Sequence, residues 1–283
     1  MTQAATLEGY LLAGQFRSLL MQHDKAIAIY TEGLKHYPDE PRLYRLRGHR
    51  NLNCRNYQEG LADLTAGAHL IEGQPDQIDY FSAETAQDIE WALLGDPRRN
   101  PQLKVTPETI AATQNMFKST LNFSIYYHLA LAHFLVEDYD SALHYYGRAG
   151  EVSIDDDART AVIDWTYMTL LRLGRREEAQ TLLDGVDTDR FVVNEGTPLY
   201  INRLRLYKGQ MSPEQLRAVA SAKPLASVTA EFAIGQWHLN AGRTAEAMDS
   251  FKRLLAEGDR YSFAYLVTER DQGKLAGELG QER

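Results

Sequence analysis

Small residues recur along this chain in one local pattern, and their spacing follows one period. A short polar step precedes each small residue, and an aromatic residue or a leucine follows it four positions later. The small residues are Ala26, Gly60, Ala142, Ala179 and Ala247. From Ala26 to Gly60 is one period of about 34 residues, and from Ala179 to Ala247 is two such periods. This period is typical of helix-turn-helix units that stack on one another, because no single unit buries its apolar face alone.

Each copy of the pattern also carries small and aromatic residues at fixed positions of two helices. The third copy is the most complete, with Tyr126, Leu129, Ala130, His133, Tyr139, Ala142, Tyr146 and Ala149. The first copy has Tyr10, Ala13, Gly14, Ala26, Tyr30, Gly33 and Pro38. In these residues the chain resembles the tetratricopeptide repeat family, and it is similar to bacterial members of that family. The resemblance implies an all-α fold, namely a right-handed α-solenoid of tetratricopeptide-like helix-turn-helix repeats.

The repeats predict one domain over residues 1–283. We place them near residues 7–40, 41–74, 123–156, 160–190, 196–222 and 228–258. The fifth repeat is degenerate, but Ser212-Pro213-Glu214 predicts a helix start within it, since Ser caps helix N-termini and Pro suits the first turn. We therefore expect helices at about 197–208 and 213–221.

The segment 73–121 departs from the repeat pattern and is predicted to be a helical insertion. Its first part, from Asp76 to Leu94, places apolar residues roughly on one face and predicts a helix. Long insertions are often functional, for example as a lid over a groove, and the alternative is a surface excursion without such a role. At the other end of the array, residues 261–279 predict a C-terminal capping helix with a polar outer face.

The resemblance implies that the first helix of each pair lines a concave groove. Registering the repeats places these ligand-binding candidates on that surface: Arg42, Arg45, His49, Tyr127, Asp164, Met168, Arg203, Phe232 and Gln236. The same register adds Leu11, Gln15 and Ser124.

Residues 42–50 form the most suggestive part of this surface, with four arginines and a histidine in one short stretch of an acidic chain. Arg42, Arg45 and His49 are spaced to share one face of a helix. Guanidinium groups bind carboxylates and phosphates through two parallel hydrogen bonds, so an anionic group is the predicted guest. The alternative is that the arginines pair with carboxylates of the chain itself, such as Asp39, Glu40, Asp63 and Asp164.

Charge and composition exclude several classes of function. The formal net charge of -9 argues against nucleic acid as a partner, because phosphate binding needs a basic excess. No run approaches the roughly 20 apolar residues that cross a bilayer, so no membrane span is predicted. A single cysteine, Cys54, cannot form an intramolecular disulfide, and we predict no metal site, no catalytic residues and no cofactor.

Residues 1–5 lack the basic and apolar segments of a signal peptide. We therefore expect a cytoplasmic protein, or alternatively a periplasmic or secreted one from which a leader has been removed.

The function predicted from these features is that of a non-catalytic scaffold. It would hold a peptide or protein partner that carries an anionic group in the concave groove. The alternative is a small-molecule-binding protein or an atypical enzyme whose pocket is closed by the 73–121 insertion. In that case the arginines would hold a small anionic ligand, and His49, His128 or Asp164 would be the acid–base groups.

Overall fold

The computed structural model describes residues 6–77, 79, 119–193, 199–221 and 224–281. Within these residues it has thirteen helices and no strand, so the predicted all-α class is confirmed. The chain divides into two compact units. Unit 1 comprises Met1–Ala132 and His144–Ala158, and unit 2 comprises His133–Leu143 and Arg159–Arg283. One continuous array over 1–283 stays a prediction.

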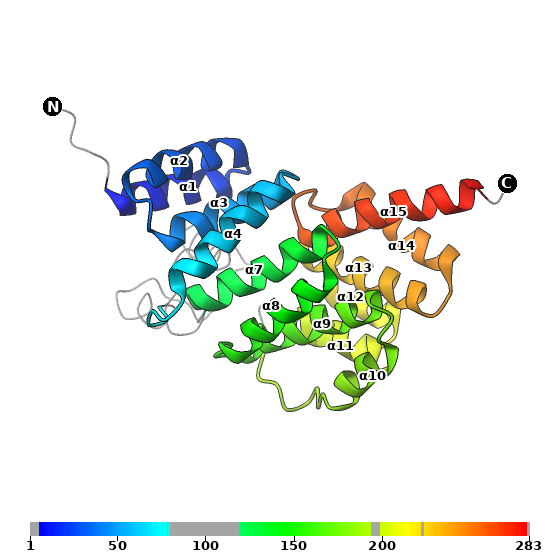
Figure 1. Cartoon of the computed structure of the whole chain (residues 1–283). Coiled ribbons are helices and arrows are strands. Elements are labelled where there is room, and N and C mark those ends of the chain that lie inside the picture. Colours follow the sequence, from blue (N-terminus) through cyan, green and yellow to red (C-terminus); the bar gives the residue numbers. More distant parts are fainter. Residues whose placement is uncertain (1–5, 78, 80–118, 194–198, 222–223, 282–283) are drawn as a thin grey trace. The chain divides into compact units, whose positions relative to one another are not determined.

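Unit 1 is built from consecutive helix pairs. Its helices are α1 (Leu7–Leu19), α2 (His23–His36), α3 (Pro41–Asn53) and α4 (Tyr57–Ile71), followed by parts of α7 (Leu121–Leu135) and α8 (Tyr139–Glu151). Helix α1 packs on α2, α2 on α3 and α3 on α4, and α1 also packs on α3 (Figure 1). The pairs α1–α2, α3–α4 and α7–α8 coincide with the first three predicted repeats.

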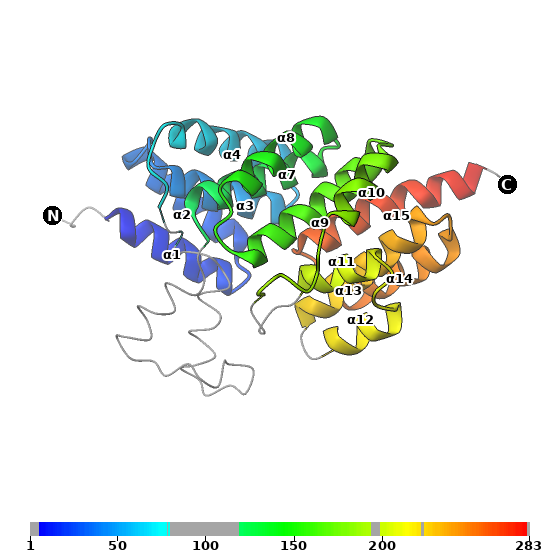
Figure 2. The same ribbon diagram turned by 90° about the horizontal axis from the view of Figure 1, so that it is seen from below.

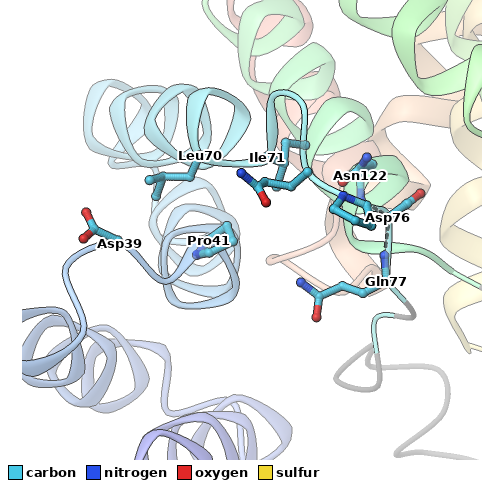
Figure 3. A pocket seen from close by; sticks show the side chains of 9 residues that line it. Asp39, Pro41, Leu70, Ile71, Asp76, Gln77 and Asn122 are labelled. Carbon is cyan, nitrogen blue, oxygen red and sulfur yellow. Dashed lines mark hydrogen bonds between the residues drawn. The ribbon is translucent and has the colours of Figure 1, made fainter.

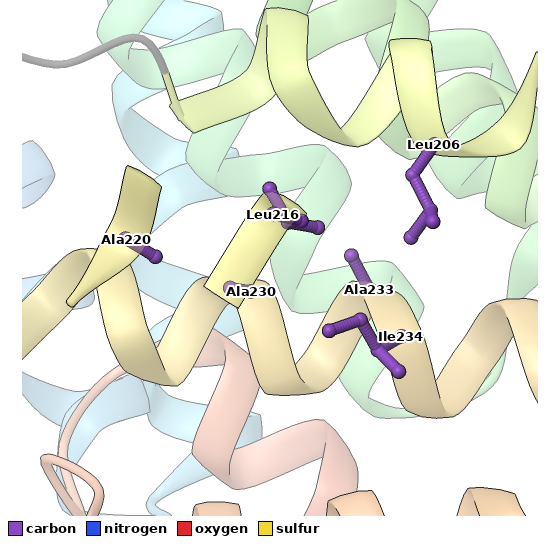
Figure 4. Close-up of a cluster of buried hydrophobic side chains, with 6 residues drawn as sticks. All are labelled: Leu206, Leu216, Ala220, Ala230, Ala233 and Ile234. Atoms are coloured by element: carbon purple, nitrogen blue, oxygen red, sulfur yellow. The ribbon is translucent and has the colours of Figure 1, made fainter. Parts of the chain in front are cut away.

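Unit 2 is also built from helix pairs, and its helices differ more in length. It contains most of α9 (Asp156–Arg172), then α10 (Arg176–Asp184), α11 (Leu199–Tyr207), α12 (Pro213–Ala220), α13 (Pro224–Asn240), α14 (Thr244–Glu257) and α15 (Phe263–Gln281). The degenerate repeat forms α11 and α12 as predicted, and Ser212 and Gln215 make a capping box at the start of α12. Figure 4 shows the core these helices share with α13: Leu206, Leu216, Ala220, Ala230, Ala233 and Ile234.

The turn inside every one of these helix pairs contains a residue with a positive φ angle. These residues are Met21, Arg55, Glu137, Gly174, Gly209 and Gly242, with φ between 56° and 74°. A left-handed residue just after a helix lets its last carbonyl groups find partners, and it reverses the chain. Apart from the interval that contains the insertion, successive turns are spaced by nearly the same period as the small residues. The turn is therefore repeated along with the small residues.

Close packing explains why small residues recur. In three pairs, a glycine of the first helix lies against a large residue of the second helix sixteen positions later: Gly14 with Tyr30, Gly48 with Leu64 and Gly235 with Phe251. A Cβ atom at Gly14 would lie 2.1 Å from Cε1 of Tyr30, and one at Gly235 would lie 2.3 Å from Cε1 of Phe251. Because both rings are fully buried, they have no room to move aside.

Substituting Gly14→Ala is expected to lower the free energy of unfolding by about 1–3 kcal/mol, because the added methyl group overpacks Tyr30. The matched control is Gly147→Ala in α8, where a Cβ meets nothing within 4 Å. There the better helix propensity of alanine is expected to stabilise the chain by about 1 kcal/mol. Urea unfolding followed by circular dichroism measures both. If both substitutions changed the free energy of unfolding in the same direction, the packing explanation would be contradicted.

The C-terminal helix α15 is held within unit 2 by a polar network. Nη1 of Arg270 donates to the carbonyl oxygens of Phe134 and Leu135 at the end of α7, at 2.7 and 3.2 Å. Beside it, Asp271 accepts hydrogen bonds from Arg172 and from Gln236. The network satisfies helix-terminal carbonyl groups that would otherwise lack partners.

The predicted helix at Asp76–Leu94 is wrong at its start. Asp76, Gln77 and Asp79 are not helical. Instead, the two ends of the insertion are tied together by backbone hydrogen bonds of 2.8 Å, from Asp79 to Ser119 and from Leu121 to Gln77. Pairing between the ends of an insertion competes with helix formation because the same N–H and C=O groups are used. Residues 78 and 80–118, with the rest of the predicted insertion helices, lie outside the described residues.

Candidate functional site

Arg42 lies at the start of α3 and is paired within its own helix cap. The side chain of Glu40 accepts a hydrogen bond from the backbone N–H of Arg42 at 3.1 Å and thereby caps the helix. The same carboxylate accepts two hydrogen bonds from the guanidinium of Arg42, at 2.7 and 2.8 Å. This pairing raises the pKa of Arg42. The guanidinium is therefore already engaged by a carboxylate of the chain.

Arg47 lies on a different side of α3 and is engaged in the same way. It donates to Asp63 of α4 from Nε at 2.9 Å and from Nη2 at 2.6 Å. Asn51 donates to the same carboxylate at 3.1 Å. For Arg42 and Arg47, the alternative that these arginines pair with the chain's own carboxylates is therefore confirmed.

Among the arginines of residues 42–50, Arg45 makes a buried ion pair. Its Nη2 atom lies 2.7 Å from Oδ2 of Asp79, and the two side chains are 5% and 3% exposed. Asp79 reaches Arg45 from the non-helical stretch at the start of the insertion, outside every repeat. Moving two charges out of water costs several kcal/mol each, so a buried guanidinium needs a carboxylate at this position.

His49 is half-buried and faces His128 of α7, with 4.3 Å between the ring centroids. Nδ1 of His128 lies 2.6 Å from the backbone oxygen of Ser124. Because a carbonyl oxygen only accepts, Nδ1 of His128 carries the proton, and in the neutral ring Nε2 is left as an acceptor. The contact joins α3 to α7 within unit 1.

Burial lowers the pKa of all three histidines near this contact. That of His128 falls to about 3, with repulsion from Arg45 as a further cause. That of His49 falls well below 6.5, and Arg50 and His128 contribute after burial. That of His23 falls to about 4 through burial and then Arg50. At neutral pH the rings are uncharged, so the positive charge in this region comes from the guanidinium groups of Arg45 and Arg50.

Tyr127 and Ser124 of α7 are the remaining predicted site residues of this region. The ring of Tyr127 stacks on Phe123 at 5.4 Å and is half-buried, whereas Ser124 is buried. We call Arg45, His49, Ser124, Tyr127 and His128 the α3–α7 cluster. Of the other residues predicted to line the groove here, Leu11 is fully buried and Gln15 is 8% exposed, so both are covered in the folded chain, as is Arg45 at 4%.

Unit 2 brings four of its predicted site residues together. Nη2 of Arg203 lies 2.5 Å from Oδ2 of Asp164, and the side chains are 1% and 0% exposed. The sulfur of Met168 accepts from Arg203 at 3.6 Å. The ring centroid of Phe232 lies 5.1 Å from Cζ of Arg203, with Tyr200 and Trp165 at 5.2 and 5.7 Å. Burial raises the pKa of Asp164 to about 7, and the Arg203 guanidinium opposes that shift.

This arrangement corrects the prediction that these residues line an open groove. Asp164, Met168, Arg203 and Phe232 are all buried, and so is Gln236, which bonds Asp271 and Arg172. The register assigned these residues to the groove surface, and the structure instead buries them. The register could not reveal that the neighbouring helices pack closely enough to exclude solvent. The Arg203–Asp164 pair agrees with the alternative that the arginines pair with carboxylates of the chain itself.

A cleft of about 570 Å³ opens beside α3 in unit 1 (Figure 3). It is lined by Asp39, Pro41, Leu70, Ile71, Gln74, Pro75, Asp76, Gln77 and Asn122. Oδ1 of Asp76 accepts from the backbone N–H groups of Gln77 and Asn122, at 2.8 and 3.1 Å, and thus holds the start of α7 to the insertion. None of the predicted site residues lines this cleft.

The described residues contain no group of three or more His, Cys, Asp or Glu side chains that could hold a metal ion. Two important acids, Asp79 and Asp271, were not identified from the sequence, because they lie in the insertion and in the cap rather than at a repeat position. No feature of their immediate sequence distinguishes them from other aspartates.

A comparison with protein-family models finds no match to this chain, and a comparison with curated proteins finds none either. Among the described residues, no helix is both long and apolar enough to span a bilayer.

Proposed function

We propose that this protein is a non-catalytic binding scaffold of the tetratricopeptide type, with its helix pairs in a right-handed solenoid. Its partner is an acidic peptide segment that lies in extended conformation against the α3–α7 cluster and places a carboxylate on Arg45. The repeated turn, the repeated glycine packing and the single period of both support the repeat assignment. The resemblance to the tetratricopeptide family implies that the first helix of each pair is the binding surface.

The Arg45–Asp79 contact is the observation that carries this proposal. The guanidinium of Arg45, on the first helix of a pair, binds the carboxylate of Asp79, which lies in a non-helical stretch of the chain. The chain therefore contains, in intramolecular form, the interaction proposed for a partner. A partner carboxylate takes the place of Asp79, so the proposal requires the two to compete.

Local electrostatics favour an anion here although the chain as a whole is acidic. The guanidinium groups of Arg45 and Arg50 both act on the pKa values of His49 and His128. Because they are 4% and 9% exposed, water screens their charges less than it screens surface charges. The half-buried rings of His49, Tyr127 and His128 supply apolar contact and polar atoms beside them.

An array of short extended peptides that differ only in a central Asp or Asn tests the proposal. The wild-type chain is expected to prefer the Asp peptides about tenfold, since a hydrogen bond to a charged group contributes about 1.5–3 kcal/mol. Asp79→Asn should raise the affinity for Asp peptides, because it frees Arg45. The double variant Arg45→Gln, Asp79→Asn should remove the preference.

The matched control is the double variant Arg47→Gln, Asp63→Asn, which neutralises an ion pair on another side of the same helix. It should keep the preference for Asp peptides. The proposal would be overturned if Asp peptides and Asn peptides bound with equal affinity both to the wild-type chain and to the Asp79→Asn variant.

A further inference from the structure

Helix α1 exposes an uninterrupted apolar face. Five of the exposed large hydrophobic residues lie on it or in the turn that follows: Leu12 at 60%, Phe16 at 58%, Leu19 at 38%, Leu20 at 48% and Met21 at 46%. The opposite face of α1 packs on α2 and α3 (Figure 2). Single exposed apolar side chains are ordinary, but a cluster of them on one helix marks an interaction surface.

The repeat register shows what kind of surface this is. Advancing Leu12, Phe16 and Leu19 by the period that separates Ala26 from Gly60 gives Leu46, Arg50 and Asn53 of α3. Those three are buried, at 2%, 9% and 5% exposure, and Leu46 belongs to a core shared with α1 and α2. On α3 this face is thus covered by the preceding helix pair. On α1 the same face is a stacking face with no helix pair of the described chain before it.

Two observations indicate that a second copy of the chain covers it. First, the described side chains of the last helix, α15, end at Leu275 and expose Glu269 and Lys274, so this part of the helix presents charged groups to a head-to-tail neighbour. Second, five side chains at these exposures present on the order of 500 Å² of apolar surface. Two such faces together bury about 1,000 Å², the lower bound for a specific interface, and a two-fold axis closes the assembly.

We propose that two copies of this protein associate through their α1 faces, with Leu12, Phe16, Leu19 and Leu20 of each chain packed against those of the other. The contact is isologous, so it forms a closed dimer rather than a filament. It leaves the α3–α7 cluster unchanged, since none of that cluster's residues is on α1, and it does not depend on the proposed function.

Light scattering coupled to gel filtration, over a hundredfold range of protein concentration, tests this. The full chain is expected to reach twice its monomer mass. Phe16→Glu and, separately, Leu20→Glu are expected to weaken the dimer at least about thirtyfold, because each places a charge in an apolar contact. Both positions are exposed, so the circular dichroism spectrum should not change.

Val219→Glu is the matched control, since Val219 is an equally exposed apolar residue of α12, at 51%. It should keep the wild-type dimer. A wild-type chain that stays monomeric at every concentration overturns the proposal. So does a dimer that survives both α1 substitutions, because its interface then lies elsewhere.

Discussion

Replacing Arg203 by methionine is expected to lower the free energy of unfolding by about 3–5 kcal/mol, because the carboxylate of Asp164 stays buried without its partner. The loss should be larger at pH 8 than at pH 5. Without Arg203, only the hydrogen bond with Tyr207 opposes the effect of burial, so the pKa of Asp164 rises further above 3.8. The native chain then holds a proton that the unfolded chain releases, so stability falls as pH rises. Urea unfolding followed by the fluorescence of Trp165, which adjoins Arg203, measures the effect.

A second substitution separates the ion pair from simple packing. The double variant Asp164→Leu, Arg203→Met removes the stranded charge and is expected to be more stable than the single variant. The control is Arg175→Met, whose partner Glu178 and own side chain are 57% and 40% exposed. An exposed pair contributes little, so no change is expected there. A single Arg203→Met variant as stable as the wild type would contradict this account.

Acidification from pH 7 to pH 5 is expected to destabilise unit 1 by about 2–4 kcal/mol, since each pKa unit corresponds to about 1.4 kcal/mol and screening of half-buried rings reduces the effect. In the folded chain the pKa of His128 is about 3 and that of His49 is well below 6.5, whereas unfolded histidine titrates near 6.5. The unfolded chain therefore binds protons that the native chain does not. The stabilisation is complete above pH 6.5 and is lost as pH falls toward 3.

Hydrogen exchange of peptides from α3 and α7, measured between pH 5 and 7 and corrected for intrinsic rates, measures the loss of stability in these two helices. The double variant His49→Gln, His128→Gln should show a smaller slope of opening free energy against pH. The control His69→Gln, at an exposed position of α4, should keep the wild-type slope. An unchanged slope in the double variant would show that other groups cause the acid sensitivity.

The helices could be predicted well because their signals are local and periodic. The capping sequence at Ser212 located α12, and the small residues located five of the six helix pairs of the described chain. The period of the small residues also reappears in the positive-φ turns, which were not part of the prediction. Where the period stops, prediction failed: the stretch from Asp76 pairs with residues 119–121 instead of starting a helix.

The candidate site was predicted only in part. The register assigned Asp164, Met168, Arg203 and Phe232 to the groove, but the structure buries them, because burial depends on how closely neighbouring helices approach. His128 was identified only as an acid–base group of the alternative function. It follows Tyr127 directly in the sequence, so the register did not place it among the groove positions. Asp79 was missed, since the partner of a buried charge is chosen by tertiary contact and not by spacing.

The amino-acid sequence by itself determined the all-helical class, the helix pairs and the positions at which only a small residue fits, because helix formation and close packing act over a few residues or one fixed period. Tertiary structure alone decided which charged groups meet. Arg45 pairs with Asp79, Arg47 with Asp63 and Arg203 with Asp164. Many carboxylates are within reach of any arginine in an unfolded chain, and only desolvation in the folded chain makes one pairing more favourable than the rest.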